Sequence, residues 1–456
     1  MGLKHRLLVL KLSVSLMAIS GCSVGPEYEA PTMNLPASYS PLGVDASKTD
    51  ARANWWKAFN DPVLDALIVR ALRDNVELNQ ARRRVEEAEA LALAAVPMAD
   101  VNGRVEAQIG SDDLGGDRVL ASLTPFATLF GAQRYRSKAA QARVEAARAQ
   151  RDNANLILLS NLTTAYVDLR FVQEQLVLKQ RERRTWARTL RDIRTLENSG
   201  QATKLDVTQV RAEIAQTEVA IRNLLTEIVR QKNRISTLLG YPAHFSKLDL
   251  GYNGKQPLPA HEVNVGVPAD LIVNRPDIRQ AERNYRATVA EIGAAESLRY
   301  PSLTLSGTIS VRNDLSPNSG GLGAVGLNIP VFDQGGRKAN VAAHELKAQT
   351  AQLEWRQRVL LAVEEVETLL VALSNSKHAH SAALRARSLN KNAVSLARRL
   401  FEVGELTVIE FLALQRESID AQLALTQNRR QLASYYVALQ IATGAGSSLP
   451  LVPETH

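Results

Sequence analysis

Two parts of the chain alternate apolar and small polar residues, the pattern of β-strands with two different faces. In the stretch 302–311, leucine, isoleucine and valine alternate with serine and threonine, and the stretch 101–109 has a similar pattern. Glycine-rich loops follow both stretches, and apolar segments then return at 119–130 and 323–332. The pattern therefore predicts two β-hairpins, at about residues 100–130 and 302–332.

Long stretches of helical character follow both predicted hairpins. Residues 132–198 contain neither proline nor glycine, and apolar residues recur there in two heptad columns. The columns are Leu162, Leu169, Leu176 and Leu190, and Ala165, Val172, Trp186 and Ile193. Such columns predict a coiled-coil seam. Gly200 can end this helix and Thr203 can cap the next one, so we expect helical hairpins over about 132–239 and 336–443.

The chain repeats with a period of 204 residues. Five pairs of proline or glycine keep this offset: Pro97 and Pro301, Gly103 and Gly307, Gly131 and Gly335, Gly200 and Gly404, and Gly240 and Gly444. The repeat predicts a duplicated unit, residues 61–240 and 265–444. Each unit is expected to run helix, β-hairpin, long helix, turn, helix. The first helices are expected at about 61–96 and 268–300, with Asp61 as N-cap and Pro62 in the first helical position.

The remaining segments lie outside the repeats. We expect a leader at 1–21, an extended N-terminal segment at 22–60, a connection between the repeats at 241–264 and a tail at 445–456.

Basic residues and a short apolar run precede Cys22, the only cysteine in the chain, as in a secretory signal. The order from Ile19 to Cys22 resembles the lipobox of bacterial lipoproteins, whose cysteine is acylated. Ser23 then suggests the outer membrane. The alternative is an ordinary signal peptide with a chance cysteine.

Composition agrees with long helices. Aromatic residues make up only 5% of the chain, and the formal net charge of +8 comes with arginines interleaved among glutamates. We interpret these charges as solvated helix faces and expect no nucleic-acid partner. No run of eighteen apolar residues follows Cys22, so any membrane crossing must use strands.

Four strands cannot close a barrel, and a membrane leaves no strand edge unpaired. The pattern therefore predicts an oligomeric β-barrel that carries long helices. The alternative is a pair of soluble hairpins packed on helices.

Several segments resemble those of one family, and the resemblance extends over nearly the whole mature chain. They are "GCSVGPEYEAP", "NWWKAFNDPVLDALIVRAL", "VPADLIVNRPDIRQAERNYRATVAEIGAAESLRYPSLTLSG" and "IPVFDQGGRKANV". They are similar to the lipoprotein (NodT/OprM-like) branch of the TolC-type outer membrane factor family. Residues before Gly131 depart from its pattern, which usually has a tryptophan and an acid there.

The resemblance implies a mainly α fold with a membrane β-barrel and an α-helical periplasmic tunnel, built by a homotrimer. It implies an efflux channel in the bacterial outer membrane, lipid-anchored through Cys22, that carries small molecules and serves a periplasmic adaptor and an inner-membrane pump of the RND type. Two other functions stay open. One is a secretion duct for protein or polysaccharide, and the other is a non-conducting lipoprotein that braces the envelope.

The resemblance also implies roles for the turns between the helices of each hairpin. The adaptor contacts would be Ser199, Gly200, Ala202, Val403, Gly404 and Leu406. A periplasmic gate would use Glu410, Phe411 and Asp206, the repeat partner of Glu410. A second acid that the family often has lies at Ala413 here, which weakens the case for a double ring of acids. The alternative for Glu410 is a solvated helix acid.

The remaining motifs give weaker evidence for a functional site. Arg181, Arg184, Arg188 and Arg191 form one helix stripe, either a docking surface for an acidic partner or, as we favour, a solvated face. The G-x-G-x-x-G at 321–326 precedes a proline in a predicted strand, so we reject a dinucleotide site. His378 and His380 have no third ligand. We therefore expect no enzyme, no metal and no cofactor beyond the lipid on Cys22.

Overall fold

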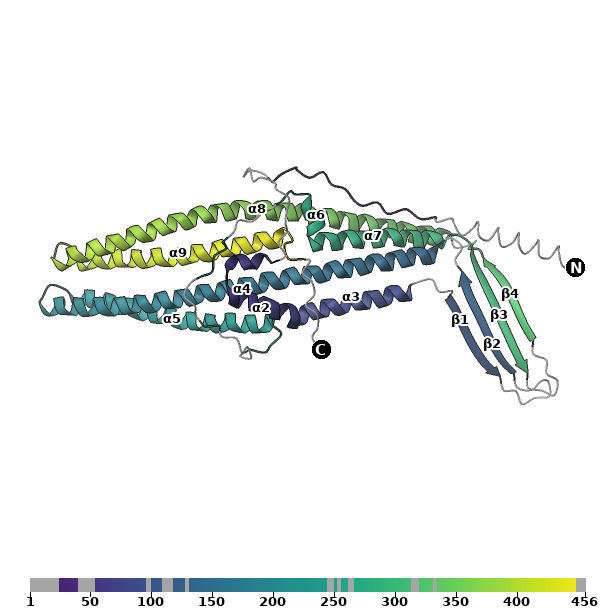
Figure 1. Ribbon diagram of the computed structural model, residues 1–456, viewed down its shortest axis with the longest axis horizontal. Helices are drawn as coiled ribbons and strands as arrows, with labels where there is room; N and C mark the ends of the chain where they lie inside the picture. The colour runs from purple at the N-terminus through teal and green to yellow at the C-terminus, as the bar shows by residue number, and fades with distance from the viewer. Residues whose placement is uncertain are drawn as a thin grey trace. The chain divides into compact units, whose positions relative to one another are not determined.

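The computed structural model describes residues 24–39, 54–95, 100–108, 118–127, 131–243, 250–251, 256–260, 266–312, 320–330 and 334–447 (Figure 1). The chain divides into two compact units. Unit 1 comprises Met1–Asn34, Arg82–Gln150 and Asp277–Arg358, and unit 2 comprises Leu35–Ala81, Arg151–Pro276 and Val359–His456. Each unit therefore takes segments from both sequence repeats. The predicted leader, Cys22 and the C-terminal tail from residue 448 lie outside the described residues.

The elements follow the predicted order in each repeat. In the first repeat they are α2 (Pro62–Asp74), α3 (Val76–Ala94), β1 (Asp100–Gln108), β2 (Arg118–Ala127), α4 (Ala132–Asn198) and α5 (Lys204–Leu238), after a 3₁₀ helix η1 (Trp55–Phe59). In the second they are α6 (Asp270–Asn274), α7 (Pro276–Ser297), β3 (Ser302–Arg312), β4 (Gly320–Asn328), α8 (Gln334–Glu402) and α9 (Val408–Ala442). Helices α5 and α9 begin and end 204 residues apart, which confirms the repeat.

The strands form one antiparallel sheet in unit 1, in the order β1-β2-β3-β4. Both predicted hairpins are present, with Val105 opposite Ala121 in the first and Gly307 opposite Gly323 in the second. Pairing of β2 with β3, Leu123 opposite Gly307, joins the two repeats. The outer edges of β1 and β4 pair with no other strand of the described chain. The strand side chains lie outside the described part, so the two-faced pattern stays a prediction.

The helices of the described chain include none that is both long and apolar enough to span a membrane. The predicted seam of α4 is largely buried. Leu162, Leu169, Trp186 and Ile193 are at most 1% exposed, while Leu176 and Leu190 are half-buried. The seam was therefore predicted correctly.

The first helix of each repeat is broken, which corrects the prediction of single helices over 61–96 and 268–300. Asn75 separates α2 from α3. Its Oδ1 accepts from Leu78 N at 2.8 Å, and its Nδ2 donates to the carbonyl of Leu238 at 2.8 Å. Arg275 separates α6 from α7 because Pro276 follows it, and its guanidinium donates to the carbonyl of Ala442 at 2.9 Å. Each break thus contacts the last residue of that repeat's final helix.

Two glycines let these contacts form. Gly240 and Gly444 have φ of +81° and +79°. A Cβ at Gly240 would lie 2.4 Å from the carbonyl oxygen of Asp74, and one at Gly444 would lie 2.6 Å from that of Asn274. The backbones of the break and of the helix end are therefore in direct contact.

A buried polar network holds the connection between the repeats. The carboxylate of Asp61 accepts from Val63 N at 3.0 Å, which confirms the predicted N-cap, and from the hydroxyl of Tyr166 at 2.5 Å. Arg170, only 1% exposed, donates to Tyr166 at 3.0 Å and to the carbonyl of Gly251 at 2.5 Å. Burial and the Asp61 carboxylate raise the pKa of Tyr166. The network therefore ties α2, α4 and the inter-repeat segment together.

Replacing Gly444 by alanine should destabilise the protein more than replacing Gly404 by alanine. Both glycines have φ of +79°, but a Cβ at Gly404 has no atom within 4 Å, whereas one at Gly444 meets a backbone carbonyl. We expect a cost of about 1 kcal/mol for Gly404→Ala and about 3 kcal/mol for Gly444→Ala in thermal or denaturant unfolding. Equal costs would contradict the proposed backbone contact.

Candidate gate and docking turns

The turns between the long helices have the same geometry in both repeats. At the first, Gly200 N donates to Glu197 O at 3.0 Å and Gln201 N to Leu196 O at 2.8 Å. At the second, Gly404 and Glu405 make the equivalent bonds to Phe401 and Leu400. Both glycines have positive φ, so each helix ends in a Schellman motif, as expected for Gly200.

A capping box starts the next helix in each repeat. Thr203 and Thr407 are the N-caps, as predicted for Thr203, and each hydroxyl accepts from the backbone three residues on at 3.3 Å. The Asp206 carboxylate accepts from Thr203 N at 2.8 Å, and the Glu410 carboxylate accepts from Thr407 N at 3.0 Å. Sequence reasoning missed this role for the two acids, although the Thr-x-x-Asp and Thr-x-x-Glu spacings signal it.

The two predicted gate acids differ in exposure. Asp206 is 7% exposed, whereas Glu410 is exposed to solvent. Hydrogen bonds from the side chain and then the backbone of Thr407 lower the pKa of Glu410. Glu410 therefore carries a negative charge in water at neutral pH, at the first turn of α9.

Phe411 belongs to the packing of the second turn. It is 3% exposed, and its ring stacks on that of Phe401 with centroids 4.8 Å apart and planes 9° apart. The guanidinium of Arg398 lies 5.9 Å from the Phe411 ring centroid. Phe411 thus joins α8 to α9. Beside it, an apolar cluster from α4, α5 and α9 holds the helices together, consisting of Trp186, Ile193, Val207, Val210, Val408 and Leu412.

Apolar side chains are exposed around both turns. Among the predicted docking residues, Val403 is 70% exposed, Ser199, Gly200 and Gly404 are exposed, and Ala202 and Leu406 are half-buried. Leu205 and Ile409, repeat partners two residues after the capping threonines, are 62% and 59% exposed. Neither was predicted as a docking residue, although each is an apolar residue in the first turn of its helix. Each turn therefore exposes large apolar side chains.

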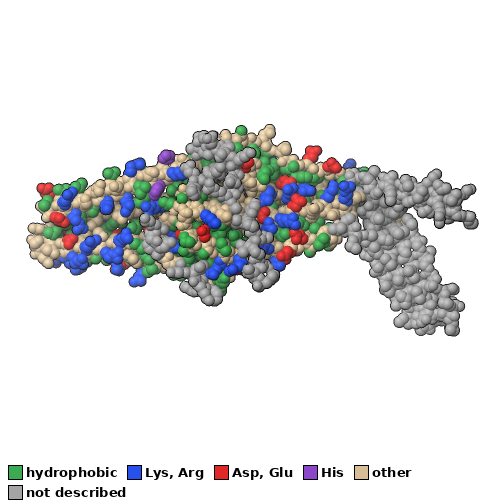
Figure 2. All heavy atoms as spheres, viewed as in Figure 1, with side chains coloured by type: hydrophobic (Ala, Val, Ile, Leu, Met, Phe, Trp, Pro, Cys, Tyr) green, Lys and Arg blue, Asp and Glu red, His purple; other side chains and the backbone are tan. Residues whose placement is uncertain are grey.

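The remaining sequence candidates show no site. Arg181, Arg184, Arg188 and Arg191 are all exposed, on a protein surface rich in basic side chains (Figure 2). Burial, and then the charge of Arg429, lower the pKa of His380. Within the described part of the chain, no three His, Cys, Asp or Glu side chains group as metal ligands. The 321–326 glycine motif lies in β4, without a helix start.

Comparisons with known proteins agree on one family. Residues 267–445 match the family model described as "Outer membrane efflux protein". Nodulation protein T of Rhizobium leguminosarum bv. trifolii is 32% identical over 94% of this chain and 96% of its own length. The toluene efflux pump outer membrane protein TtgF of Pseudomonas putida is 29% identical over 97% and 99%. The solved outer-membrane channel OprN has a TM-score of 0.85 at 25% identity, over 93% of this chain and all of that chain.

Removing the second cap should loosen the turn. Thr407→Ala removes the hydroxyl that accepts from Glu410 N, which costs about 1 kcal/mol at an N-cap. We expect amide hydrogen exchange over residues 407–412 to accelerate about fivefold. Ser199→Ala is the matched control, because that exposed hydroxyl donates only to the carbonyl of Leu196. Unchanged exchange in Thr407→Ala would contradict a stabilising role for the capping box.

Proposed function

Because the chain belongs to the outer membrane efflux protein family, we propose that it is a passive conduit for small molecules that opens at the turns 199–203 and 403–407. The general function follows from the family. The chain is the outer-membrane channel of a tripartite efflux system, and it acts as a trimer with an adaptor and an inner-membrane pump. We propose further that this pump is of the RND type and that the cargo is small molecules.

Relatives' names support small molecules as cargo. One relative is named a toluene efflux pump outer membrane protein, and another an antibiotic efflux pump outer membrane protein. A third is named a cation efflux system protein. These names concern cargo much smaller than protein or polysaccharide. They favour efflux of small molecules over a secretion duct and over a brace that conducts nothing.

The proposed gate uses Glu410. This carboxylate is exposed, and its capping bonds hold it at the start of α9. Three copies around a trimer axis would form an anionic ring that attracts cations. Asp206 is buried and would contribute less to that ring. Phe411 would make α8 and α9 move together, because its ring stacks between them.

The apolar turns suit a protein partner. Large apolar side chains are exposed at both turns, Leu205 at the first and Val403 and Ile409 at the second. Exposed apolar patches mark interaction sites. We assign this surface to the adaptor, together with Ser199, Gly200, Ala202, Gly404 and Leu406.

The lipid anchor completes the proposal. Cys22 would carry acyl chains, adding membrane affinity for each buried CH₂. Gly25, three residues on, is held by its backbone N–H donating to Tyr135 Oη at 2.9 Å, which in turn donates to Gly25 O at 3.1 Å. These two hydrogen bonds would hold the acylated end of the chain at the start of α4.

Neutralising Glu410 should alter conduction without losing the cap. Glutamine at this position can still accept from Thr407 N, so Glu410→Gln removes only the charge. We expect a lower cation preference and a changed single-channel conductance in planar bilayers. Glu77→Gln removes the same charge from the first turn of α3 and should have no effect. Equal conductance and ion preference in all three proteins would rule out a gate role for Glu410.

Replacing Cys22 by serine should affect delivery alone. Without acyl chains, Cys22→Ser should fail to incorporate labelled palmitate and should reach the outer membrane less efficiently. Exported instead with a cleavable signal peptide, assembled Cys22→Ser trimers should conduct like the wild type. Normal palmitate labelling of the variant would show that the lipid is attached elsewhere.

A further inference from the structure

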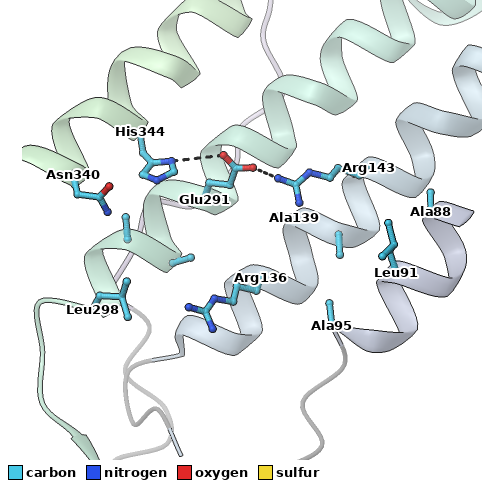
Figure 3. Close-up of a pocket in the computed structure, with 13 residues that line it drawn as sticks. Ala88, Leu91, Ala95, Arg136, Ala139, Arg143, Glu291, Leu298, Asn340 and His344 are labelled. Atoms are coloured by element: carbon cyan, nitrogen blue, oxygen red, sulfur yellow. Dashed lines mark hydrogen bonds and ion pairs between the residues drawn. The ribbon is translucent and has the colours of Figure 1, made fainter. Parts of the chain in front are cut away.

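A cavity of about 710 Å³ opens in unit 1 between α3, α4, α7 and α8 (Figure 3). Small and apolar side chains line it, among them Ala88, Leu91, Ala139, Ala294, Ala295 and Leu298. Polar side chains line it too, from α4 (Arg136 and Arg143), α7 (Glu291) and α8 (Asn340 and His344). The cavity is therefore amphipathic, and it is large enough for an organic molecule of one or two rings.

The polar side chains at the cavity have an excess of positive charge. Glu291, whose side chain is 14% exposed, is bonded to Arg143 and accepts from Lys347 Nζ at 2.8 Å. His344 Nδ1 lies 3.6 Å from the same carboxylate, and this buried nitrogen has no hydrogen-bond partner. Arg136 forms no ion pair with any described residue and is exposed at the cavity. Two cations, Arg143 and Lys347, therefore pair with one carboxylate, and Arg136 adds a third positive charge, an excess that favours an anionic ligand.

The cavity lies on the side of α7 opposite the N-terminal segment. Tyr28 bonds to Glu282 and lies edge-on to the Tyr285 ring, 5.8 Å away. Gly25 lies so close to Gly293 that a Cβ on Gly25 would be 2.3 Å from it. Helix residues advance by about 100° each, so Glu291 and Gly293 point about 200° apart.

If Cys22 is acylated, its chains would enter lipid outside the barrel, and the segment from Gly25 onward would lie on the outer face of the channel wall. The opposite face of α7 then faces the lumen. This step depends on the proposed lipid anchor.

We propose that this cavity is a luminal binding site for amphipathic organic anions in transit through the channel. The anionic group would bind Arg136 and Arg143, and the apolar part would lie against the alanine and leucine side chains. The site would make the channel more permeable to such anions than a plain water-filled duct of the same width, because it offers them a weak intermediate binding site.

Two probes of equal size and opposite charge test the proposal. 1-Naphthalenesulfonate should block single-channel current of the full-length trimer in planar bilayers at about tenfold lower concentration than 1-naphthylmethylammonium. The Arg136→Gln/Arg143→Gln variant should abolish this difference. Arg134→Gln is the matched control, since this exposed arginine on α4 does not line the cavity. Equal block by both probes in the wild type would overturn the proposal.

A second variant tests the site without removing an arginine, in case the double variant misfolds. A second measurement detects binding even if the channel conducts no current. Ala294→Phe should occupy part of the cavity and weaken block by the sulfonate without removing any charge. Titration calorimetry of the trimer in nanodiscs with 1-naphthalenesulfonate measures binding directly. Binding without conduction would contradict only the proposed conduit. Conduction without binding, as when a neighbouring copy fills the cavity, would overturn only this inference.

Discussion

The described helices of unit 2 depend on one contact made twice, between a broken helix and the end of the repeat's last helix. Asn75 donates to Leu238 O and Arg275 to Ala442 O, and these two acceptors are 204 residues apart. The backbones meet so closely that only glycine fits at 240 and 444. A carbonyl at a helix end has no partner within the helix, so the side chain that reaches it satisfies a group that would otherwise need water. The contact fixes where the last helix ends, and with it the register of the whole helical hairpin.

Sequence alone predicted the regular parts of this fold, because their signals are local. Gly200, Thr203 and Asp61 adopt their predicted capping roles within a few residues of themselves. The break at Asn75 was missed because its local cap on Leu78 N is a weak signal and its other partner, Leu238 O, lies 163 residues away. The break at Arg275 was readable from the proline after it. Burial of Phe411 likewise depends on Phe401 of the preceding helix, a contact that no single-helix pattern reveals.

Duplication has preserved backbone geometry better than side-chain environment. Gly200 and Gly404 have φ of +78° and +79°, yet their neighbours Asp206 and Glu410 differ, one buried and one exposed. The longer glutamate side chain still completes the capping box. An acid that caps its own helix has a stabilised charge, because its hydrogen bonds favour the ionised form. Glu410 can therefore cap its helix and also carry the negative charge of the proposed gate. Its exposure does not follow from the capping box, because Asp206 forms the same box and is buried.

The charges of the conduit do not share one sign. Glu410 adds negative charge at the start of α9, whereas Arg136 and Arg143 add positive charge to the cavity in unit 1. A pore lined by one sign of charge selects strongly against ions of that sign. If both sites line the conduit as proposed, ions of either charge would meet one attractive and one repulsive site. Selection of cargo would then fall to the pump, because a passive channel requires a permissive duct with only weak local sites.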